Sequence, residues 1–456
     1  MAPRILRAGA AVSNITPRLG VSINGGFTDH RAEHVHDELY ARCLVLDDGN
    51  SQIGLVVCDN CLMPGALLDM AKHEAHGHLR ITPDRMLISA THTHSAPSVV
   101  SVFQSDADLD YAEFLVSRIS DGIRRAVNHL APAKIGWGVG REPSQLNNRR
   151  WRMKPGAIPP NPFGRTDQVR MNPPPGSADL VEPAGPTDPD VSLLAVTTVE
   201  GRPLAVFANY SLHYVGGVPG STISADYYGA FAESLARLIG IDATRNDPPF
   251  VAIMSNGASG DANNINFRRP APRQQPYEQM RHVAHSVASE AARVWKQIKF
   301  QDHAPLDMSE ARLTLGRRLP AADEVARAKT ILARARGPQL QTPEEVYANE
   351  TLQMAEWPKT KETVVQAIRI GGLGIAALPC EVFAETGLAI KAASPLRPTF
   401  TISLANDYAG YLPPPAQHRL GGYETWRARS SYLEVEAEPK LRGKAIELLT
   451  ALARRM

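Results

Sequence analysis

Short runs rich in valine, isoleucine and leucine recur along the chain, and each is bounded by turn-forming or charged residues. Runs of this length with such boundaries are typical of buried β-strands. Helices must cover a sheet of such strands, because a sheet with one face in water alternates apolar and polar positions. The chain is therefore predicted to contain mixed, buried β-sheets, with strands near residues 41–48, 52–59, 85–90, 191–200, 203–210, 249–257, 363–370, 373–380 and 399–407.

Amphipathic helical segments lie between these runs. In residues 109–130 the apolar positions recur close to the helical period of 3.6 residues. Similar patterns predict helices near residues 226–240, 278–298, 321–336, 381–393 and 438–455. Strands and helices in this irregular order predict an α/β fold, with mixed buried β-sheets flanked by helices, rather than a repeating βαβ barrel.

The chain has 456 residues and is predicted to form one large catalytic domain over 1–456. Residues 141–190 are crowded with proline, glycine, asparagine and arginine, which predicts a long structured loop inserted into that domain. Residues 316–360 are charged and rich in alanine, which predicts helices exposed on one side. No internal repeat or low-complexity linker divides the chain.

Charge and hydropathy exclude several classes of partner. The formal net charge is +2 and no long basic block occurs, so we expect no nucleic-acid partner. No apolar stretch reaches the roughly 20 residues that span a bilayer, so we expect no stable membrane insertion. Arg4 and Arg7 interrupt the apolar residues at the N-terminus, which argues against a signal peptide and predicts a cytoplasmic protein. A small molecule is the expected partner, and whether the chain forms a homo-oligomer is left open by the sequence.

Four cysteines are too few for a disulfide framework in a chain of this length, which favours a reducing compartment. Cys58 and Cys61 form a C-x-x-C pattern without a second pair to complete a zinc knuckle. We interpret both as small apolar side chains at a strand end. A redox or metal role is the alternative.

Polar side chains follow five of the predicted strands. In open α/β sheets, ligands bind outside the carboxyl ends of strands, where neighbouring loops converge. These side chains are therefore expected to meet in one crevice, and they are His92 and His94, His213, Asp261, Glu381 and Tyr408.

The spacing of His92 and His94 suits a metal pair. In extended backbone, residues two apart project to the same face, so both imidazoles can reach one ion at about 2.0–2.1 Å. A third histidine and a carboxylate complete a zinc shell that keeps one position open. Each of these residues could also have a purely structural role. His34 and His36 form a second His-x-His pattern, so the pattern alone does not identify a metal site. A lone histidine, glutamate or tyrosine more often packs in the core, caps a helix or forms a hydrogen bond than binds a metal.

Several stretches together resemble the neutral ceramidase family, zinc amidases that hydrolyse the amide of N-acyl sphingosine. They cover nearly the whole chain and read "RAGAAVSNITP", "ISATHTHSAP", "FANYSLHYVGG", "SNGASGDANNINF", "ALPCEVFAETG", "NDYAGYLPP" and "YETW". The histidine segment is the most specific of them.

The resemblance implies a Zn²⁺ cofactor and assigns the site residues by position. The implied zinc ligands are His92, His94, His213, Glu381 and Tyr408. Arg149 of "LNNRRW" would face the substrate carbonyl or the developing oxyanion, and Tyr423 would be a second tyrosine near the site. His36 falls where the family also has a histidine near the pocket.

Three departures from the family predict a substrate other than ceramide itself. Asn263 stands where the family has a serine two positions after the aspartate, so the hydrogen bonds inside the site should differ. The chain ends in a helical pattern, where the family continues into an immunoglobulin-like domain. Family members are mostly exported, whereas no signal peptide is expected here.

The predicted function is a zinc-dependent hydrolase that cleaves an amide bond with metal-activated water, whose pKa the ion lowers to about 7. Glu381 or Asp261 would accept the proton from water, and His36 or one of the ligand histidines would protonate the leaving group. An esterase, lactonase or cyclic-amide hydrolase is the first alternative, with segment 141–190 covering a polar pocket. A catalytically inactive ligand- or metal-binding homologue is the second.

Overall fold

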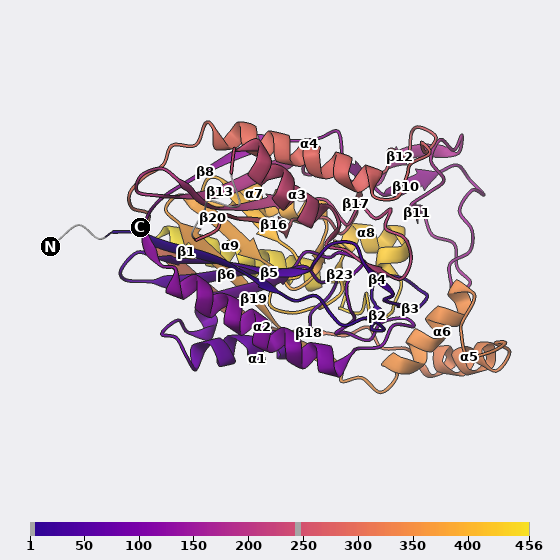
Figure 1. The fold of residues 1–456 in the computed structure, drawn as a ribbon. Coiled ribbons are helices and arrows are strands. Elements are labelled where there is room, and N and C mark those ends of the chain that lie inside the picture. Colours follow the sequence, from indigo (N-terminus) through magenta and orange to yellow (C-terminus); the bar gives the residue numbers. More distant parts are fainter. Residues whose placement is uncertain (1–4, 242–247, 456) are drawn as a thin grey trace.

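The predicted strands assemble into two main sheets in a computed structural model that describes residues 5–241 and 248–455 (Figure 1). The described part of the larger sheet has eight strands. In spatial order they are β16 (Val251–Asn256), β14 (Pro203–Tyr210), β13 (Asp190–Thr198), β8 (Ala131–Arg141), β1 (Arg7–Asn14), β5 (Tyr40–Asp47), β6 (Gln52–Cys58) and β7 (Met86–Ala90). The smaller sheet runs β18 (Leu306–Gly316), β19 (Thr360–Ile370), β20 (Leu373–Ala377) and β22 (Thr399–Ile402). Mixed sheets confirm the predicted α/β class.

The larger sheet is divided into two halves. Strands β1 and β8 pair only through Arg7 with Pro132 and Ala8 with Ala131. Strands β6 and β7 in one half, and β14 and β16 in the other, all begin near this short contact and run away from it. Their carboxyl ends therefore lie at the same end of the molecule.

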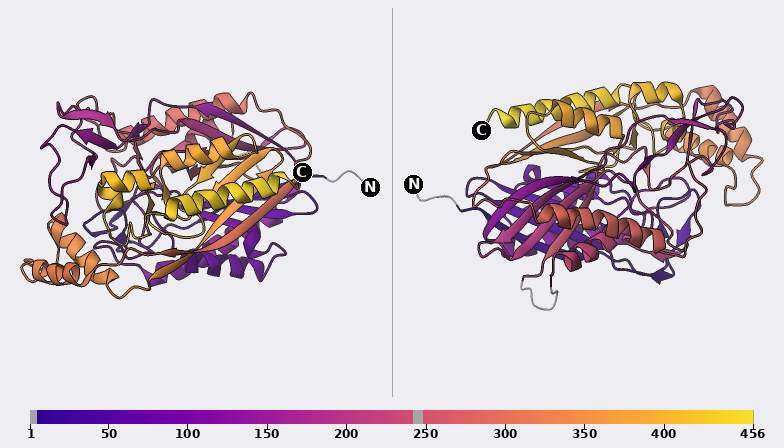
Figure 2. Two further views of the ribbon diagram at one scale, coloured as in Figure 1. Left: turned by 180° about the vertical axis from the view of Figure 1, so that it is seen from behind. Right: turned by 90° about the horizontal axis from the view of Figure 1, so that it is seen from above.

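Both halves and the smaller sheet share one apolar core, in which the rings of Phe207 and Phe400 stack at 6.4 Å between centroids. Helices cover the outer faces (Figures 1 and 2). Helices α1 (Gly65–His76) and α2 (Leu109–Asn128) cover one half of the larger sheet, and α3 (Asp226–Leu238) and α4 (Glu278–Trp295) cover the other. Helices α7 (Ala384–Ala393) and α9 (Ala437–Ala453) cover the smaller sheet.

This double covering explains the continuous apolar runs. In β5, Cys43 and Val45 face helices α1 and α2, whereas Leu44 and Leu46 face the shared core. Alternate side chains of a strand point to opposite faces, so a strand covered on both faces is apolar at nearly every position.

Two long segments interrupt the sheets. Residues 142–189 lie between the paired strands β8 and β13 and contain a small sheet of β11 (Val169–Met171), β10 (Arg150–Met153) and β12 (Leu180–Pro183). Residues 317–359 lie between β18 and β19 and contain α5 (Ala322–Leu332) and α6 (Pro343–Met354). Figure 1 places these helices at the end of the molecule far from both termini.

Short strand pairs, one short α-helix and two 3-10 helices, Pro83–Arg85 and Tyr423–Thr425, complete the described elements. The pairs are β2 (Ser22–Ile23) with β3 (His30–Arg31), β4 (His34–Val35) with β15 (Thr222–Ile223), β17 (Ala262–Asn263) with β9 (Asn147–Asn148), and β21 (Glu381–Val382) with β23 (Tyr411–Leu412). Helix α8 is Pro415–Leu420. Among the described helices, none is long and apolar enough to cross a bilayer.

Candidate metal centre

Three buried side chains meet where the carboxyl ends of the strands converge. His92 follows β7, His213 follows β14, and Glu381 begins β21. The two Nε2 atoms are 3.1 Å apart, and Glu381 Oε2 lies 3.2 Å from His92 Nε2 and 3.9 Å from His213 Nε2. The larger sheet supplies both histidines, and the segment that follows β20 of the smaller sheet supplies the glutamate.

The backbone at His92 differs from the prediction. Strand β7 ends at Ala90, and His92 has a φ of 76°, in the left-handed region. The expectation that His92 and His94 project to the same face of extended backbone is therefore wrong. The His92 amide donates instead to the Asn60 carbonyl at 2.9 Å, which holds the turn. The two Nε2 atoms still lie 3.2 Å apart, because the turn directs both rings inward.

Backbone carbonyls fix which nitrogen of each ring is free. His92 Nδ1 lies 2.9 Å from the Cys61 carbonyl, and His213 Nδ1 lies 3.2 Å from the Ser259 carbonyl. Each Nδ1 can therefore carry the proton and donate, which leaves Nε2 with its lone pair. Second-sphere contacts of this kind orient histidine ligands in metal sites.

These donors fit a metal ion. Glu381 Oε2 is buried and has no hydrogen-bond partner among the described residues. Glu381 Oε2, His92 Nε2 and His213 Nε2 face one another closely enough for one cation to bind all three, in place of a proton held between His92 and Glu381. A nitrogen and oxygen donor set suits zinc. We infer that His92, His213 and Glu381 would hold such an ion, since their ligand atoms all lie within 4.8 Å of one another.

Burial and neighbouring charges give the three histidines different pKa values. Burial lowers the pKa of His94 and His213 well below the usual value, and the neighbouring positive charge of Arg149 adds to the effect. Burial has the same tendency at His92, but the Glu381 carboxylate and Cys61 together outweigh it and raise the pKa of His92 well above its usual value. His94 and His213 are therefore neutral, which is the form that binds a metal.

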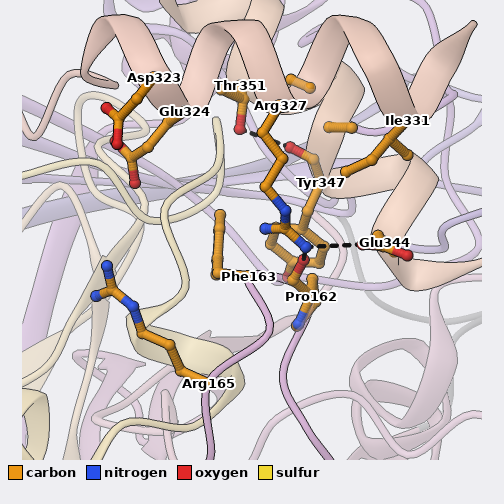
Figure 3. A pocket seen from close by; sticks show the side chains of 12 residues that line it. Pro162, Phe163, Arg165, Asp323, Glu324, Arg327, Ile331, Glu344, Tyr347 and Thr351 are labelled. Carbon is orange, nitrogen blue, oxygen red and sulfur yellow. Dashed lines mark hydrogen bonds and ion pairs between the residues drawn. The ribbon is translucent and has the colours of Figure 1, made fainter.

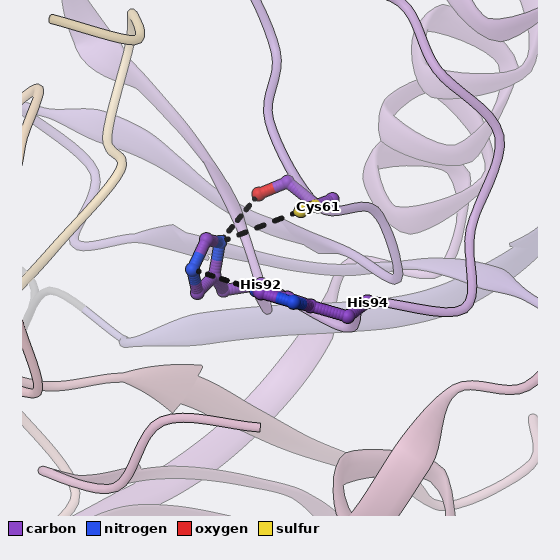
Figure 4. Close-up of side chains that lie close together, drawn as sticks. All are labelled: Cys61, His92 and His94. Atoms are coloured by element: carbon purple, nitrogen blue, oxygen red, sulfur yellow. Dashed lines mark hydrogen bonds between the residues drawn. The ribbon is translucent and has the colours of Figure 1, made fainter. Parts of the chain in front are cut away.

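A second group of donors shares His92. It consists of Cys61, His92 and His94 (Figure 4). Cys61 Sγ lies 3.7 Å from His92 Nδ1, the nitrogen that already faces the Cys61 carbonyl. Burial raises the pKa of the Cys61 thiol, and a neutral thiol is a weak ligand. This group is therefore the poorer metal site of the two.

His94 lies at the open side of the cluster and is only partly buried. Its ring stacks on Tyr214 at 3.6 Å between centroids. Gly25 passes over it so closely that a Cβ there would lie 2.5 Å from His94 Cγ. Beside the cluster, the Tyr408 hydroxyl donates to Glu381 Oε1 at 3.3 Å. The five residues that the resemblance implies as ligands therefore lie together.

Arg149 is buried next to this group. Its Nε donates to Glu424 at 2.8 Å, and its Nη2 donates to the Gly260 carbonyl at 2.9 Å and the Tyr411 hydroxyl at 3.1 Å. Glu424 is fully buried and also pairs with Arg150. These partners hold the guanidinium in one orientation.

Two candidate residues lie away from the cluster. Asp261 is fully buried, and its oxygens accept from the Ala384 amide at 2.8 Å and from Asn148 Nδ2 at 2.7 Å. Burial raises its pKa to about 6. Both oxygens bind the protein, so its position does not support a role as proton acceptor. Asn263, expected to change hydrogen bonds inside the site, donates instead to Asn172 at 3.2 Å.

His36 and Tyr423 take different positions. His36 is exposed, stacks on Tyr277 at 3.7 Å and lines a cavity of about 690 Å³ that includes none of the cluster residues. Its position does not support proton transfer at the cluster. Tyr423 is half-buried, and its ring lies 5.7 Å from that of Tyr411, beside the cluster.

Tyr423 also lines an apolar cavity of about 650 Å³. Segment 142–189 and the start of α6 supply most of its wall, including Ile158, Val169 and Met171. Phe27, two residues after Gly25, lies in the same wall. None of the cluster residues lines this cavity, so its connection to the cluster runs through Tyr423, beside Tyr411.

The sequence pattern did not indicate Tyr214, Tyr411 or Glu424. Tyr214 directly follows His213, and Glu424 directly follows Tyr423, so both lie inside stretches that the resemblance covers. Their neighbours in sequence were the only signal. Tyr411 contacts Arg149 only because β23 pairs with β21, a pairing of two-residue strands.

The fold is that of a known class of hydrolase. The neutral ceramidase of Pseudomonas aeruginosa superposes with a TM-score of 0.73 at 17% sequence identity, over 99% of this chain and 75% of that one. A ceramidase complexed with C2 superposes with a TM-score of 0.75 at 17% identity, over 99% of this chain and 76% of that one. No protein-family model matches the chain. The neutral ceramidase resemblance predicted from the sequence is thus confirmed in the fold.

Proposed function

We propose that the protein is a zinc-dependent hydrolase that cleaves an amide bond. The observation that carries this proposal is the convergence of His92 Nε2 and His213 Nε2 on the unpartnered Glu381 Oε2. A zinc ion held there would act as a Lewis acid and lower the pKa of a water. The amide class is proposed because the neighbours in structure are ceramidases.

The surrounding side chains suit the remaining needs of hydrolysis. His94 is partly exposed and points its Nε2 toward the cluster, so the neutral imidazole can accept a hydrogen bond from a water and orient it there. The hydroxyl group of Tyr423 is a donor for a developing oxyanion, a contribution of about 3 kcal/mol in comparable sites, whereas the Tyr408 hydroxyl holds Glu381 Oε1. Arg149, held by Tyr411 and Glu424, adds a fixed positive charge beside the cluster.

The apolar cavity supports a particular kind of substrate. About 650 Å³ is the size of cavity that accepts a drug-sized molecule. We propose an amide that carries one apolar substituent, bound between Tyr423 and segment 142–189. A polar amide would leave the apolar wall in contact with water, and a two-chain lipid would exceed the cavity.

Zinc content and activity test the proposal together. The wild-type protein should bind one zinc per chain and hydrolyse N-acyl amides with medium-length apolar groups faster than N-acyl sphingosine. His92→Ala and His213→Ala should remove both properties. His34→Ala is the matched control, because His34 belongs to the other His-x-His and is exposed. Stoichiometric zinc in His92→Ala would contradict the site.

Parallel assays with esters, lactones and cyclic amides separate the alternatives. Faster turnover of an ester or lactone would replace the amide assignment and leave the metal site intact. Zinc binding without turnover of any of these substrates would favour the non-catalytic homologue.

A further inference from the structure

A second cavity, of about 310 Å³, lies on the other side of Trp426 from the apolar one. Segment 161–168, α8 and residues 421–427 form most of its wall. Four arginines line it, against two carboxylates, and we name it the basic cavity. Its charged residues are Arg165, Arg318, Arg419, Arg427, Asp167 and Glu324.

The two carboxylates do not balance these arginines. Glu324 pairs with Arg427 at 2.9 Å, and Asp167 accepts from Trp426 Nε1 and Asn161 Nδ2. Neither contacts Arg318, which donates only to oxygens of Thr425, Ser431 and Leu433. Arg318 therefore has no carboxylate partner among the described residues, although it is largely buried.

Further donors are unused at the basic cavity. Arg427 Nε and Nη2 are buried and have no hydrogen-bond partner in the described part of the chain. Arg165 and Arg419 are exposed at the rim. Figure 3 shows the Arg165 guanidinium pointing away from Phe163, with no dashed line to the other side chains that it draws. Four arginines against two carboxylates around one cavity, only one of which pairs with an arginine among the described residues, favour the binding of an anion there.

The pKa values of two residues in the wall of the basic cavity agree with a positive electrostatic potential there. Burial and the neighbouring Arg427 lower the pKa of Arg318 to about 10. Burial, Arg318 and Arg150 lower the pKa of His418 to about 3. Both shifts mean that added positive charge is unfavourable here, so an anion would be favoured.

We propose that the basic cavity binds a small divalent oxyanion of the phosphate or sulfate class. Guanidinium groups recognise such oxygens through charge-assisted, often bidentate hydrogen bonds. The volume of the basic cavity, about 310 Å³, also leaves room for the small organic group of a phosphate monoester. The wall includes residues 421–427, and Gly421 and Glu424 of that segment bind Arg150. Anion binding should therefore stabilise the segment that orients Arg149, whichever reaction the metal centre performs.

Calorimetric titration of the full chain tests this. Inorganic phosphate, sulfate and glycerol phosphate are the probes, with chloride at matched ionic strength as the blank. Phosphate should bind once per chain, in metal-free and zinc-loaded protein alike. In the double variant Arg165→Ala/Arg419→Ala the dissociation constant should rise at least about tenfold. These two side chains have no partners in the described residues, so the fold should persist.

The control removes an exposed arginine elsewhere. Arg202 lies in the turn between β13 and β14, at the end of the sheet opposite the metal centre. Arg202→Ala should leave phosphate affinity unchanged. Equal affinity in the double variant and the wild type, equal weakening by Arg202→Ala, or equal heat from chloride would each overturn the proposal. If glycerol phosphate binds more tightly than phosphate, the natural anion is a phosphate ester.

Discussion

Gly25 determines where the ring of His94 can lie. Its φ is +115°, which disfavours a side chain, and a Cβ would lie 2.5 Å from His94 Cγ. Gly25→Ala should displace His94 and lower kcat/KM about a hundredfold, because displacements near 1 Å have that effect on positioned groups. Zinc content should be unchanged, since His92, His213 and Glu381 remain in place.

Gly20 offers a control matched in backbone conformation. Its φ is +86°, and nothing lies within 4 Å of a Cβ built there. Gly20→Ala therefore introduces similar backbone strain without touching a site residue, and kcat/KM should be preserved. Equal losses in the two variants would mean that strain, and not the displacement of His94, lowers activity.

Glu424 neutralises two buried arginines at once. Replacing it by glutamine would leave Arg149 and Arg150 without their shared carboxylate. Glu424→Gln should lower the free energy of unfolding by about 3–5 kcal/mol, the usual effect of breaking a buried ion pair from one side. Chemical denaturation measures this.

An exposed pair provides the comparison for Glu424. Glu362 lies 3.2 Å from Arg312 on the surface, where both side chains are more than half exposed. Glu362→Gln should change the free energy of unfolding by less than about 1 kcal/mol. If both variants lost a similar free energy of unfolding, the buried pairs of Glu424 would not stabilise the fold more than an exposed pair does.

At the scale of elements, Asp261 joins the start of α7 to the β9–β17 pair. Its folded pKa of about 6 exceeds the ordinary value of 3.8, because burial disfavours the charge. The folded state therefore binds more protons than the unfolded state between about pH 4 and 6. The stability that this group contributes is complete below about pH 4 and is lost as the pH rises through 6, a change of about 3 kcal/mol.

Asp261→Asn tests this sign. The asparagine cannot titrate, so the decline in the free energy of unfolding from pH 4 to 6 should be shallower than in the wild type. The slope is the readout, because the new amide also faces Asn148 and changes the absolute stability. Asp302→Asn, at an exposed position, should leave the slope unchanged.

Hydrophobic periodicity predicted most elements but not all. Strands covered on both faces, such as β5 and β14, appear as continuous apolar runs. Strand β18 is an edge strand with many partly exposed positions, and β8 contains glycines at 136, 138 and 140. Side chains at these glycines would meet α4 and residues 298–299, so close packing there replaces large apolar side chains. Neither strand has the composition that periodicity detects.

The site was predictable only in part. Four of the site residues each follow a recognisable strand, so the strand topology alone predicts that their side chains lie close together. They are His92, His213, Glu381 and Tyr408. The left-handed turn at His92 and the pairing that brings Tyr411 to Arg149 depend on contacts between distant segments. Local pattern contains no information about such contacts.

At the scale of the whole molecule, the proposed ion would join the two sheets. Zinc at a thousandfold excess over its dissociation constant should stabilise the fold by about 4 kcal/mol. The melting temperature should therefore rise with zinc and fall with a chelator, as measured by calorimetry. His92→Ala should melt at the same temperature with and without zinc. A wild-type melting temperature indifferent to zinc would argue against an ion at this position.

The separation of the donors along the chain has a consequence for biosynthesis. Chains leave the ribosome from the N-terminus, and domains fold as units once their residues have emerged. His92 and His213 emerge early, whereas Glu381, which supplies the carboxylate, stands at position 381 of 456 residues. A nascent or prematurely terminated chain would present two histidines without the carboxylate. Metal acquisition would thus be an event of the finished polypeptide, and incomplete translation products would not sequester zinc in the cell.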